Sequence, residues 1–418
     1  MLNKLTGLFY GWRMVAASAA VRMLGAGLHS YGFTVFFLPL SQELHLSRTA
    51  TSFAFSLARA EGAIEGPIVG NLLARYGPRP VMLVAVSLMG LGYLLLSQTT
   101  TYIAFLIIYT GMISLAHAGG FMHAPMTLTN TWFIRLRARA MTINSAAYGL
   151  GGVLLAPLLG MVVHAWGWRW GAAMAGMAFL LIGLPLCLTI RNSPESMGLL
   201  PDGENRTANS GDRTESRASI SEAEVTAGQA IRSFAFWALV FGAAVRNASY
   251  HAISTHFIPL LVWKGMSQQQ ATLLLSTFAF LGFSSTLVFG WLADTMNKPR
   301  LISLILFTAS LSILFLIFGH SLAPLAIFIL LFTTVEATYP VAWAMVGDIF
   351  GRKHFAKIRG YMSVFYVWGS VLGPVMAGAV WDRWHTYEPM LWVLVGLFFL
   401  SSTFYSCLGK PWTRPKKD

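Results

Sequence analysis

Two stretches of the chain, GGVLLAPLLG at residues 151–160 and GSVLGPVMAG at residues 369–378, share a pattern of small residues around a proline. At a constant offset of 217 residues, Gly152, Ala156, Pro157 and Gly160 match Gly369, Gly373, Pro374 and Ala377, and Phe133 and Arg135 match Phe350 and Arg352. A repeat of this length predicts that the chain folds as two structurally equivalent halves.

The amino-acid composition indicates whether these halves lie in water or in a membrane. Of the 418 residues, 56% are hydrophobic and only 11% are charged, whereas a soluble domain carries about 25% charged residues. Such a chain cannot cover a water-exposed surface of ordinary polarity, which excludes a soluble enzyme and a disordered protein. Cys187 and Cys407 lie in apolar runs, which excludes a disulfide scaffold and a cysteine-based zinc module. The composition therefore predicts a membrane protein.

A helix needs about 20 mostly apolar residues to cross the hydrocarbon core of a bilayer. Twelve spans meet this condition: 12–38, 49–74, 79–98, 102–129, 141–164, 168–190, 234–262, 268–293, 299–319, 322–347, 357–380 and 388–408. Their continuous apolar runs favour helices over barrel strands, and the first run is too long for a cleavable signal. We expect an all-α polytopic membrane protein with twelve transmembrane helices in two pseudo-symmetric six-helix bundles, residues 12–190 and 234–408.

The positions of the charged residues predict the orientation. The net charge is +13, but the cations lie between apolar segments and not on a soluble face, which argues against a nucleic-acid partner. One set of short loops carries eleven Lys and Arg residues and the opposite set carries four. By the positive-inside rule, the richer set and both termini are cytoplasmic. We therefore expect a multi-pass protein of the cell (inner) membrane.

Residues 191–233, between the two predicted bundles, are polar. They hold five Lys and Arg and seven Asp and Glu residues and are rich in Ser, Thr and Gly. This composition predicts a flexible cytoplasmic linker. A partner-docking segment is the alternative.

Several motifs resemble the major facilitator superfamily. The loop motif GNLLARYGPRP at 70–80 is similar to the family's cytoplasmic loop between helices 2 and 3, although Ala74 stands where the family usually has Asp. FYGWRMVAAS at 9–18, TWFIRLRARAMTINSAAYGLGG at 131–152, SPESMGLLPDG at 193–203 and HFIPLLVWKGMS at 256–267 resemble the bacterial monocarboxylate and oxalate/formate branch. The resemblance implies two bundles that rock about a central site, with the first, fourth, seventh and tenth helices lining the cavity.

Ionisable residues at membrane depth are costly and indicate function. They are Arg22, His29, Arg59, Glu61, Glu65, His117, His123, Arg246, His251, His256 and Glu336. Apart from the cluster at 59–65, all of them fall on the four helices that the resemblance places at the cavity. The span 268–293 has no charge, whereas carriers of this branch typically place an Arg there.

Arg246 and Glu336 lie near the middle of their spans and are the leading site candidates. An Arg offers a bidentate fork to an anion, and a carboxylate at low dielectric can carry a proton. The alternative is a permanent salt bridge between the two. The substrate-binding candidates are Arg246, Tyr250, Tyr339, Arg22 and His117, and the proton-coupling candidates are Glu336, Glu61, Glu65 and His251.

Glu61 and Glu65 are four residues apart and share a helix face, where two bare carboxylates repel. Arg22 or Arg59 pairs with them, as a structural ion-pair cluster, or one of them is protonated and couples transport. On the same helix, Gly62, Gly66 and Gly70 form two overlapping G-x-x-x-G spacings, which predict close packing or a sliding seam.

The sequence has no nucleotide-binding motif of the G-x-x-x-x-G-K-[ST] type and no H-E-x-x-H or G-x-S-x-G motif. We therefore expect that the protein is not an enzyme and binds no cofactor or metal. The expected driving force is an ion or substrate gradient. The expected function is secondary active transport of small organic anions, in particular monocarboxylates, by proton-coupled symport or exchange. A proton-driven drug or metabolite exporter and a transporter-like receptor are the alternatives. The expected partners are the anion, protons and membrane lipid, and we expect a monomer.

Overall fold

The computed structural model describes residues 9–32, 36, 39, 43, 65–203 and 225–408, and every regular element in these ranges is a helix. The all-α fold class is thereby confirmed. Nine helices in the described ranges are long and apolar enough to cross a membrane. They coincide with the third to sixth and the eighth to twelfth predicted spans.

The chain divides into two compact units. Unit 1 comprises Met1–Ala227 and Gly347–Val364, and unit 2 comprises Gly228–Val346 and Phe365–Asp418. The predicted bundles, 12–190 and 234–408, stay a prediction. The division differs from them in one respect, because the end of the tenth span and the start of the eleventh belong to unit 1.

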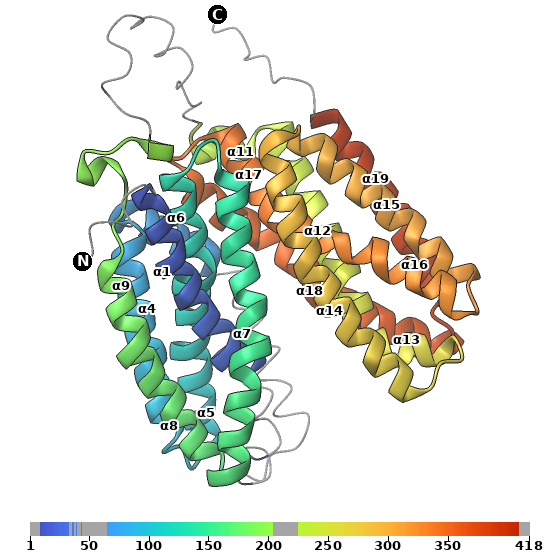
Figure 1. Ribbon diagram of the computed structural model, residues 1–418, viewed down its shortest axis with the longest axis horizontal. Coiled ribbons are helices and arrows are strands. Elements are labelled where there is room, and N and C mark those ends of the chain that lie inside the picture. The colour runs from blue at the N-terminus through green and yellow to red at the C-terminus, as the bar shows by residue number, and fades with distance from the viewer. Residues whose placement is uncertain are drawn as a thin grey trace, which may run out of the picture. The chain divides into compact units, whose positions relative to one another are not determined.

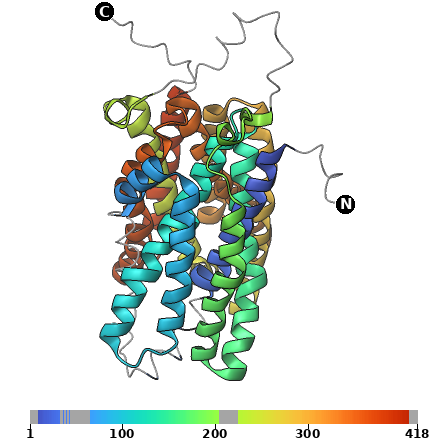
Figure 2. The same ribbon diagram turned by 90° about the vertical axis from the view of Figure 1, so that its left-hand side faces the viewer.

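Unit 1 contains helices that run lengthwise beside one another (Figures 1 and 2). They are α1 (Tyr10–Gly25) with η1 (Ala26–Tyr31), a helix over 65–76, α4 (Pro78–Leu96), α5 (Tyr102–Ile108), η2 (Tyr109–Ser114), η3 (His117–His123), α6 (Ala124–Trp132), α7 (Arg137–Trp166), α8 (Trp168–Ala178), η4 (Phe179–Gly183), α9 (Leu184–Thr189), η5 (Glu195–Met197) and η6 (Pro201–Gly203). The elements η1 to η4 are π-helical turns inside longer helices.

Unit 2 contains the remaining helices. They are α11 (Ala227–Ile231), α12 (Phe234–Thr255), α13 (Phe257–Trp263), α14 (Gln268–Thr295), α15 (Lys298–Phe318), α16 (Leu322–Phe332), the 3₁₀ turn η7 (Thr333–Ala337), α17 (Thr338–Phe350), α18 (Phe355–Trp384) and α19 (Glu388–Leu408), with the end of α17 and the start of α18 in unit 1. Ser267 and Gln270 form a capping box at the start of α14, which satisfies N–H groups that the first helical turn leaves unpaired.

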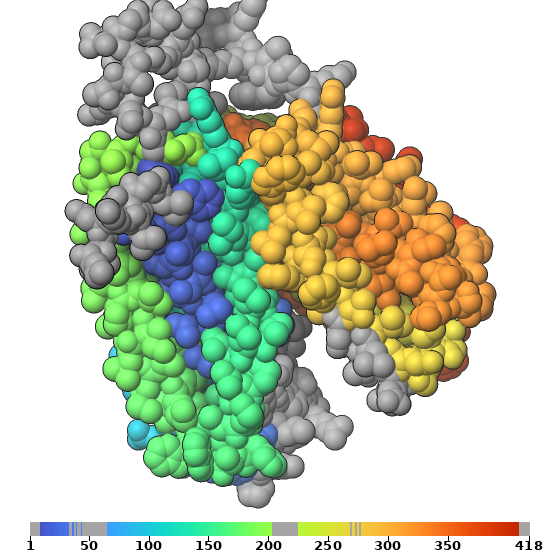
Figure 3. Space-filling model, viewed as in Figure 1, coloured from blue at the N-terminus to red at the C-terminus, as the bar shows by residue number. Residues whose placement is uncertain are grey.

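Apolar side chains lie both in the interior of unit 1 and on its outer surface, as expected for a protein surrounded by lipid. In unit 1, α1 packs against α7 and α4 packs against α8 around buried residues such as Val86 and Phe121. The outer face of α7, part of which is visible in Figure 3, exposes large apolar side chains, including Val153 and Trp166. A water-facing helix would carry charges there, so this face suits contact with lipid.

The first part of the predicted linker is ordered. Residues 191–203, which we call the strap, follow α9 and cross one end of unit 1, at the top of Figure 1. Arg79 donates its backbone N–H to Asn192 Oδ1 at 2.8 Å, and the side chain of Asn192 fills the space beside Gly77, whose φ is 81°. The prediction of a flexible linker is therefore wrong for 191–203, while 204–224 lie outside the described ranges.

Glu43 binds the first turn of α8, at the end predicted to be extracellular. Its carboxylate accepts hydrogen bonds from Trp168 Nε1 and from Arg169, with Arg169 Nη2 at 2.8 Å from Glu43 Oε1. The hydrogen bond from Trp168 and then that from Arg169 lower the pKa of Glu43. The helix dipole also stabilises a negatively charged side chain near a helix N-terminus.

The predicted glycine seam makes the close contact that its spacing indicates. A Cβ on Gly66 would lie 2.6 Å from the carbonyl oxygen of Gly360, and a Cβ on Gly360 would lie 2.2 Å from the carbonyl oxygen of Gly66. A Cβ on Gly70 would lie 2.6 Å from the carbonyl oxygen of Ala356. The packing interpretation is confirmed for Gly66 and Gly70, Gly62 lies outside the described ranges, and sliding stays a prediction.

We expect Gly360→Ala to destabilise the protein, because the added methyl group meets backbone atoms that cannot rotate away. Overpacking of this kind costs about 1–3 kcal/mol. The matched control is Gly396→Ala on α19, where a Cβ meets nothing within 4 Å. Thermal melting in detergent should show a lower midpoint for Gly360→Ala and an unchanged or higher one for Gly396→Ala. Equal midpoints for the two variants would contradict the close backbone contact.

Candidate functional site

The leading candidates meet in unit 2. Arg246 on α12 donates from Nη2 to Glu336 Oε2 at 3.0 Å, and the side chains of these residues are 11% and 30% exposed. In this conformation the two residues form an ion pair, as the salt-bridge interpretation expected. The Glu336 side chain is therefore less shielded than that of Arg246.

Glu336 lies in a 3₁₀ turn within its helix. Its span runs as α16, then η7, then α17, with Glu336 inside η7. In a continuous α-helix, the carbonyl of Glu336 would accept the N–H of residue 340, but Pro340 has none. The proline therefore accounts for the 3₁₀ turn, and such a turn within a helix often marks a functional hinge.

Two aromatic rings contact the Arg246 guanidinium. Its Cζ lies 5.0 Å from the ring centre of Tyr250 and 5.5 Å from that of Tyr339, both within the range of a cation–π contact. Tyr250 also makes an edge contact with the ring of His251 at 5.6 Å. The structure thus brings Arg246, Glu336, Tyr250, Tyr339 and His251 together in unit 2. Their role in binding substrate or protons stays a prediction.

Asn247 belongs to this site and was not predicted. Its Oδ1 accepts a hydrogen bond from Arg246 Nη1 at 3.0 Å, and its Nδ2 donates to the backbone carbonyl of Tyr366 on α18 at 3.4 Å. Asn247 therefore fixes the guanidinium against a neighbouring helix. The sequence feature that could have identified Asn247 is the polar run RNASYH at 246–251 inside an apolar span.

The uncharged eighth span packs directly on the acid. A Cβ added to Gly282 on α14 would lie 3.5 Å from Glu336 Cγ, and Ser285 Oγ donates to the backbone carbonyl of Thr333 at 3.1 Å. On the face of α14 that meets this turn, the chain has small residues that leave room for Glu336. The charge of the site is thus supplied by α12 and η7.

A second polar cluster lies in unit 1, where η1 and η3 face each other. The rings of His29 and His117 are 4.7 Å apart, and His117 Nε2 is hydrogen-bonded to Ser30 Oγ at 2.9 Å. The Tyr93 hydroxyl lies within hydrogen-bond distance of the Leu28 carbonyl at 3.2 Å and of His29 Nδ1 at 3.0 Å. π-Helical turns are rare and frequently occur at functional sites.

Arg22 is buried near the same helices. Its Nη2 lies 3.9 Å from Met122 Sδ, and its Cζ lies 5.5 Å from the ring centre of Tyr148 on α7. Glu65 is buried as well, while Glu61 and Arg59 lie outside the described ranges. The predicted pairing of Arg22 or Arg59 with the two acids therefore stays a prediction.

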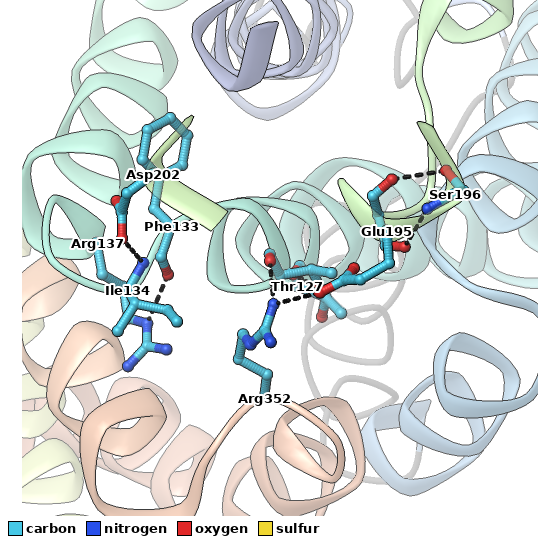
Figure 4. Close-up of polar contacts among 10 residues, drawn as sticks. Thr127, Phe133, Ile134, Arg137, Glu195, Ser196, Asp202 and Arg352 are labelled. Atoms are coloured by element: carbon cyan, nitrogen blue, oxygen red, sulfur yellow. Dashed lines mark hydrogen bonds and ion pairs between the residues drawn. The ribbon is translucent and has the colours of Figure 1, made fainter. Parts of the chain in front are cut away.

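The strap forms a third cluster, at the end of unit 1 predicted to be cytoplasmic (Figure 4). The Asp202 carboxylate accepts the backbone N–H groups of Ile134 at 2.9 Å, Arg135 at 2.8 Å and Leu136 at 3.4 Å. These three residues immediately precede α7, whose own N-cap residue makes no side-chain cap. Asp202 thus caps α7 from 66 residues away along the chain.

Charged residues of the segment 347–364 bind the same end of unit 1. Asp348 accepts a hydrogen bond from Arg137 Nη1 at 2.5 Å, and the Arg137 side chain is 1% exposed. Arg352 Nη1 donates at 3.0 Å both to the carbonyl of Thr131 and to Glu195 Oε1 of the strap. Arg359 Nη1 donates to the carbonyls of Met122 and His123. The sequence repeat pointed to Arg135 and Arg352 but not to their partners.

Comparison with known proteins is consistent with this architecture. The family model described as Major Facilitator Superfamily matches residues 15–335 and 257–417. Human monocarboxylate transporter 11 is 26% identical over 94% of this chain and 82% of its own length, and golden hamster (Mesocricetus auratus) monocarboxylate transporter 2 is 24% identical over 96% and 84%.

Solved structures of transporters share the fold. The human organic anion transporter TETRAN superposes with a TM-score of 0.69 at 16% identity, over 95% of this chain and 100% of that one. The E. coli fucose:proton symporter, in a variant form, superposes with a TM-score of 0.70 at 14% identity, over 94% and 98%. The chain is therefore a multi-pass membrane transporter that belongs to the major facilitator superfamily and resembles its monocarboxylate transporters.

Proposed function

We propose that the chain carries small organic anions, in particular monocarboxylates, across the cell (inner) membrane, with both termini in the cytoplasm. Transport occurs by alternating access and is coupled to protons, as symport or exchange. The observation that supports this proposal is the Arg246–Glu336 pair, whose acid is partly exposed and whose guanidinium contacts two tyrosine rings. The monocarboxylate transporters among its relatives support the same substrate class.

The geometry links proton binding to anion binding. Glu336 presents a carboxylate to Arg246 Nη2, and a substrate carboxylate can take the same position. When Glu336 binds a proton, it loses its charge and releases the guanidinium, which then needs a new counter-ion. Substrate binding completes the exchange, so that one proton and one anion enter together and the site keeps the same net charge.

Unit 1 supplies the remaining proposed contacts. Arg22, with its charge against the ring of Tyr148, and His117, bonded to Ser30, are proposed to line the path of the anion. His251 beside Tyr250, together with Glu61 and Glu65, is proposed as an additional proton-binding group. These assignments are subordinate to Arg246 and Glu336, whose variants test the mechanism first.

Replacing Arg246 with Lys should weaken substrate binding. Lysine keeps the charge but cannot donate in two directions at once to the substrate and Asn247. Losing a charged hydrogen bond costs about 1.5–3 kcal/mol, which raises the KM for a carboxylate roughly 10-fold to 100-fold. The measurement is uptake of labelled lactate and related monocarboxylates into proteoliposomes. Arg300→Lys, at an exposed position in the first turn of α15, is the control and should leave the KM unchanged.

Replacing Glu336 with Gln should uncouple transport from the pH gradient. The amide resembles the protonated acid, so anion binding no longer requires a proton. Uptake driven by an inward proton gradient is expected to fall to the level seen without one, while exchange of internal for external substrate continues. Glu388→Gln, an exposed acid, should keep the full response to the gradient.

The two variants also have outcomes that oppose the proposal. If Arg246→Lys and Glu336→Gln fold normally and transport carboxylates with unchanged KM and pH dependence, the pair is only a structural ion pair. If the wild-type protein moves no carboxylate but a proton gradient drives the export of cationic dyes, the exporter interpretation replaces the proposed function.

A further inference from the structure

Gly282 on α14 is a buried glycine that close packing does not explain. A Cβ on Gly369 or Gly373 of α18 would overlap a backbone carbonyl oxygen of α12, so these two positions have no room for a side chain. Among the described residues outside its own helix backbone, a Cβ on Gly282 would meet one atom within 4 Å, Glu336 Cγ at 3.5 Å. Because glycine weakens the interior of a helix relative to alanine, what this glycine provides is a space beside the acid.

The proposed exchange of carboxylates requires Glu336 to leave Arg246. Glu336 Oε2 accepts from Arg246 Nη2 at 3.0 Å, and a substrate carboxylate that binds there needs the space that the acid occupies. Toward α12 the acid meets the guanidinium, which is itself in contact with the rings of Tyr250 and Tyr339. Toward α14, in contrast, the methylene group of the acid faces Gly282, which has no side chain.

The same part of α14 offers an acceptor for the proton of a neutral acid. Ser285 lies one turn after Gly282, and its Oγ donates to the backbone carbonyls of Gly282 at 3.0 Å and of Thr333 at 3.1 Å. Thr333 and Glu336 are three residues apart in the 3₁₀ turn η7, so they lie on one face of that turn. Since a hydroxyl that donates can still accept, Ser285 Oγ can accept from a protonated carboxyl group that turns toward α14.

The charge around Glu336 comes from one direction. The charged group that faces it is Arg246 on α12, and the titratable side chains beside this pair are Tyr250, His251 and Tyr339. The helices α14, α15 and α16 also pack against η7. They hold no ionisable residue in the stretches 268–293, 301–318 and 322–332. A carboxyl group that turns toward α14 therefore leaves its counter-ion, which favours its neutral form there.

We propose that Gly282 is a positioning residue for proton-coupled transport. The space at Gly282 receives the side chain of protonated Glu336 when it leaves Arg246, and the guanidinium becomes available to the substrate carboxylate. This inference rests on the proposed function and adds to it the place to which the acid moves. It also accounts for a glycine and a serine one turn apart on an otherwise apolar helix.

Filling the space should oppose the release of the acid without weakening the fold. The methyl group of Gly282→Ala is at ordinary contact distance from Glu336 in the ion pair, but it occupies space that the released carboxyl group needs. In proteoliposomes, we expect the KM for labelled lactate at fixed pH to rise about fivefold to tenfold, the lower part of the range for overpacking by one methyl group. Half-maximal uptake should require a proton concentration that is higher by a similar factor.

Three controls connect the effect to the acid. Gly396→Ala on α19, where a Cβ meets no described residue within 4 Å, should leave the KM and the pH dependence unchanged. In the Glu336→Gln background, Gly282→Ala should not alter the pH dependence, because the acid is absent. Thermal melting in detergent should give Gly282→Ala an unchanged or higher midpoint, since alanine favours a helix. A lower midpoint would show that the space does not exist.

The outcomes separate this inference from the function on which it rests. Infrared difference spectra detect the C=O band of protonated Glu336 without substrate, and the band is identified by its absence from Glu336→Gln. The band should need a higher proton concentration in Gly282→Ala, and an unchanged requirement, or an unchanged KM and pH dependence of lactate uptake, would overturn the role of Gly282. A wild-type protein that transports no carboxylate, while its band responds to Gly282→Ala, would contradict the proposed function and support the link between Gly282 and the acid.

Discussion

A largely shielded guanidinium is the constraint on which the packing around Arg246 in unit 2 depends. Arg246 cannot lose its charge, and moving an uncompensated charge out of water is costly. The surrounding chain meets that requirement with a carboxylate, an amide oxygen and two ring faces, each from a different position on α12, η7 or α17. These contacts join α12 to the turn at η7 and to α17, so the residues proposed to bind the anion also link the helices of unit 2.

Much of this organisation could be predicted from the amino acids. Long apolar runs predict helices because a bilayer leaves backbone groups no other partners, and the repeat around Pro157 and Pro374 predicts two halves. The pairing of Arg246 with Glu336 follows from scarcity, since few ionisable groups stand at membrane depth. The glycine spacing at Gly66 and Gly70 likewise predicted a close neighbour, although not that Gly360 would provide it.

Other features could not be predicted because they depend on contacts distant in sequence. The π-helical turns at His29 and His117 leave no periodic signal, and the capping of α7 by Asp202 joins residues 66 or more positions apart. A polar, acidic composition made residues 191–233 look flexible throughout. Composition reports the average preference of a segment, whereas Asn192, Glu195 and Asp202 are held by backbone groups and cations of neighbouring helices.

The 3₁₀ turn at η7 has a mechanical consequence. Because Pro340 removes the hydrogen bond that would continue the α-helix through Glu336, α16 and α17 are joined by a tighter turn at the acid. Under the proposed mechanism, the residue that gains and loses a proton therefore lies in the turn that connects the two helices. A change of charge at this residue would then act directly on the connection between α16 and α17.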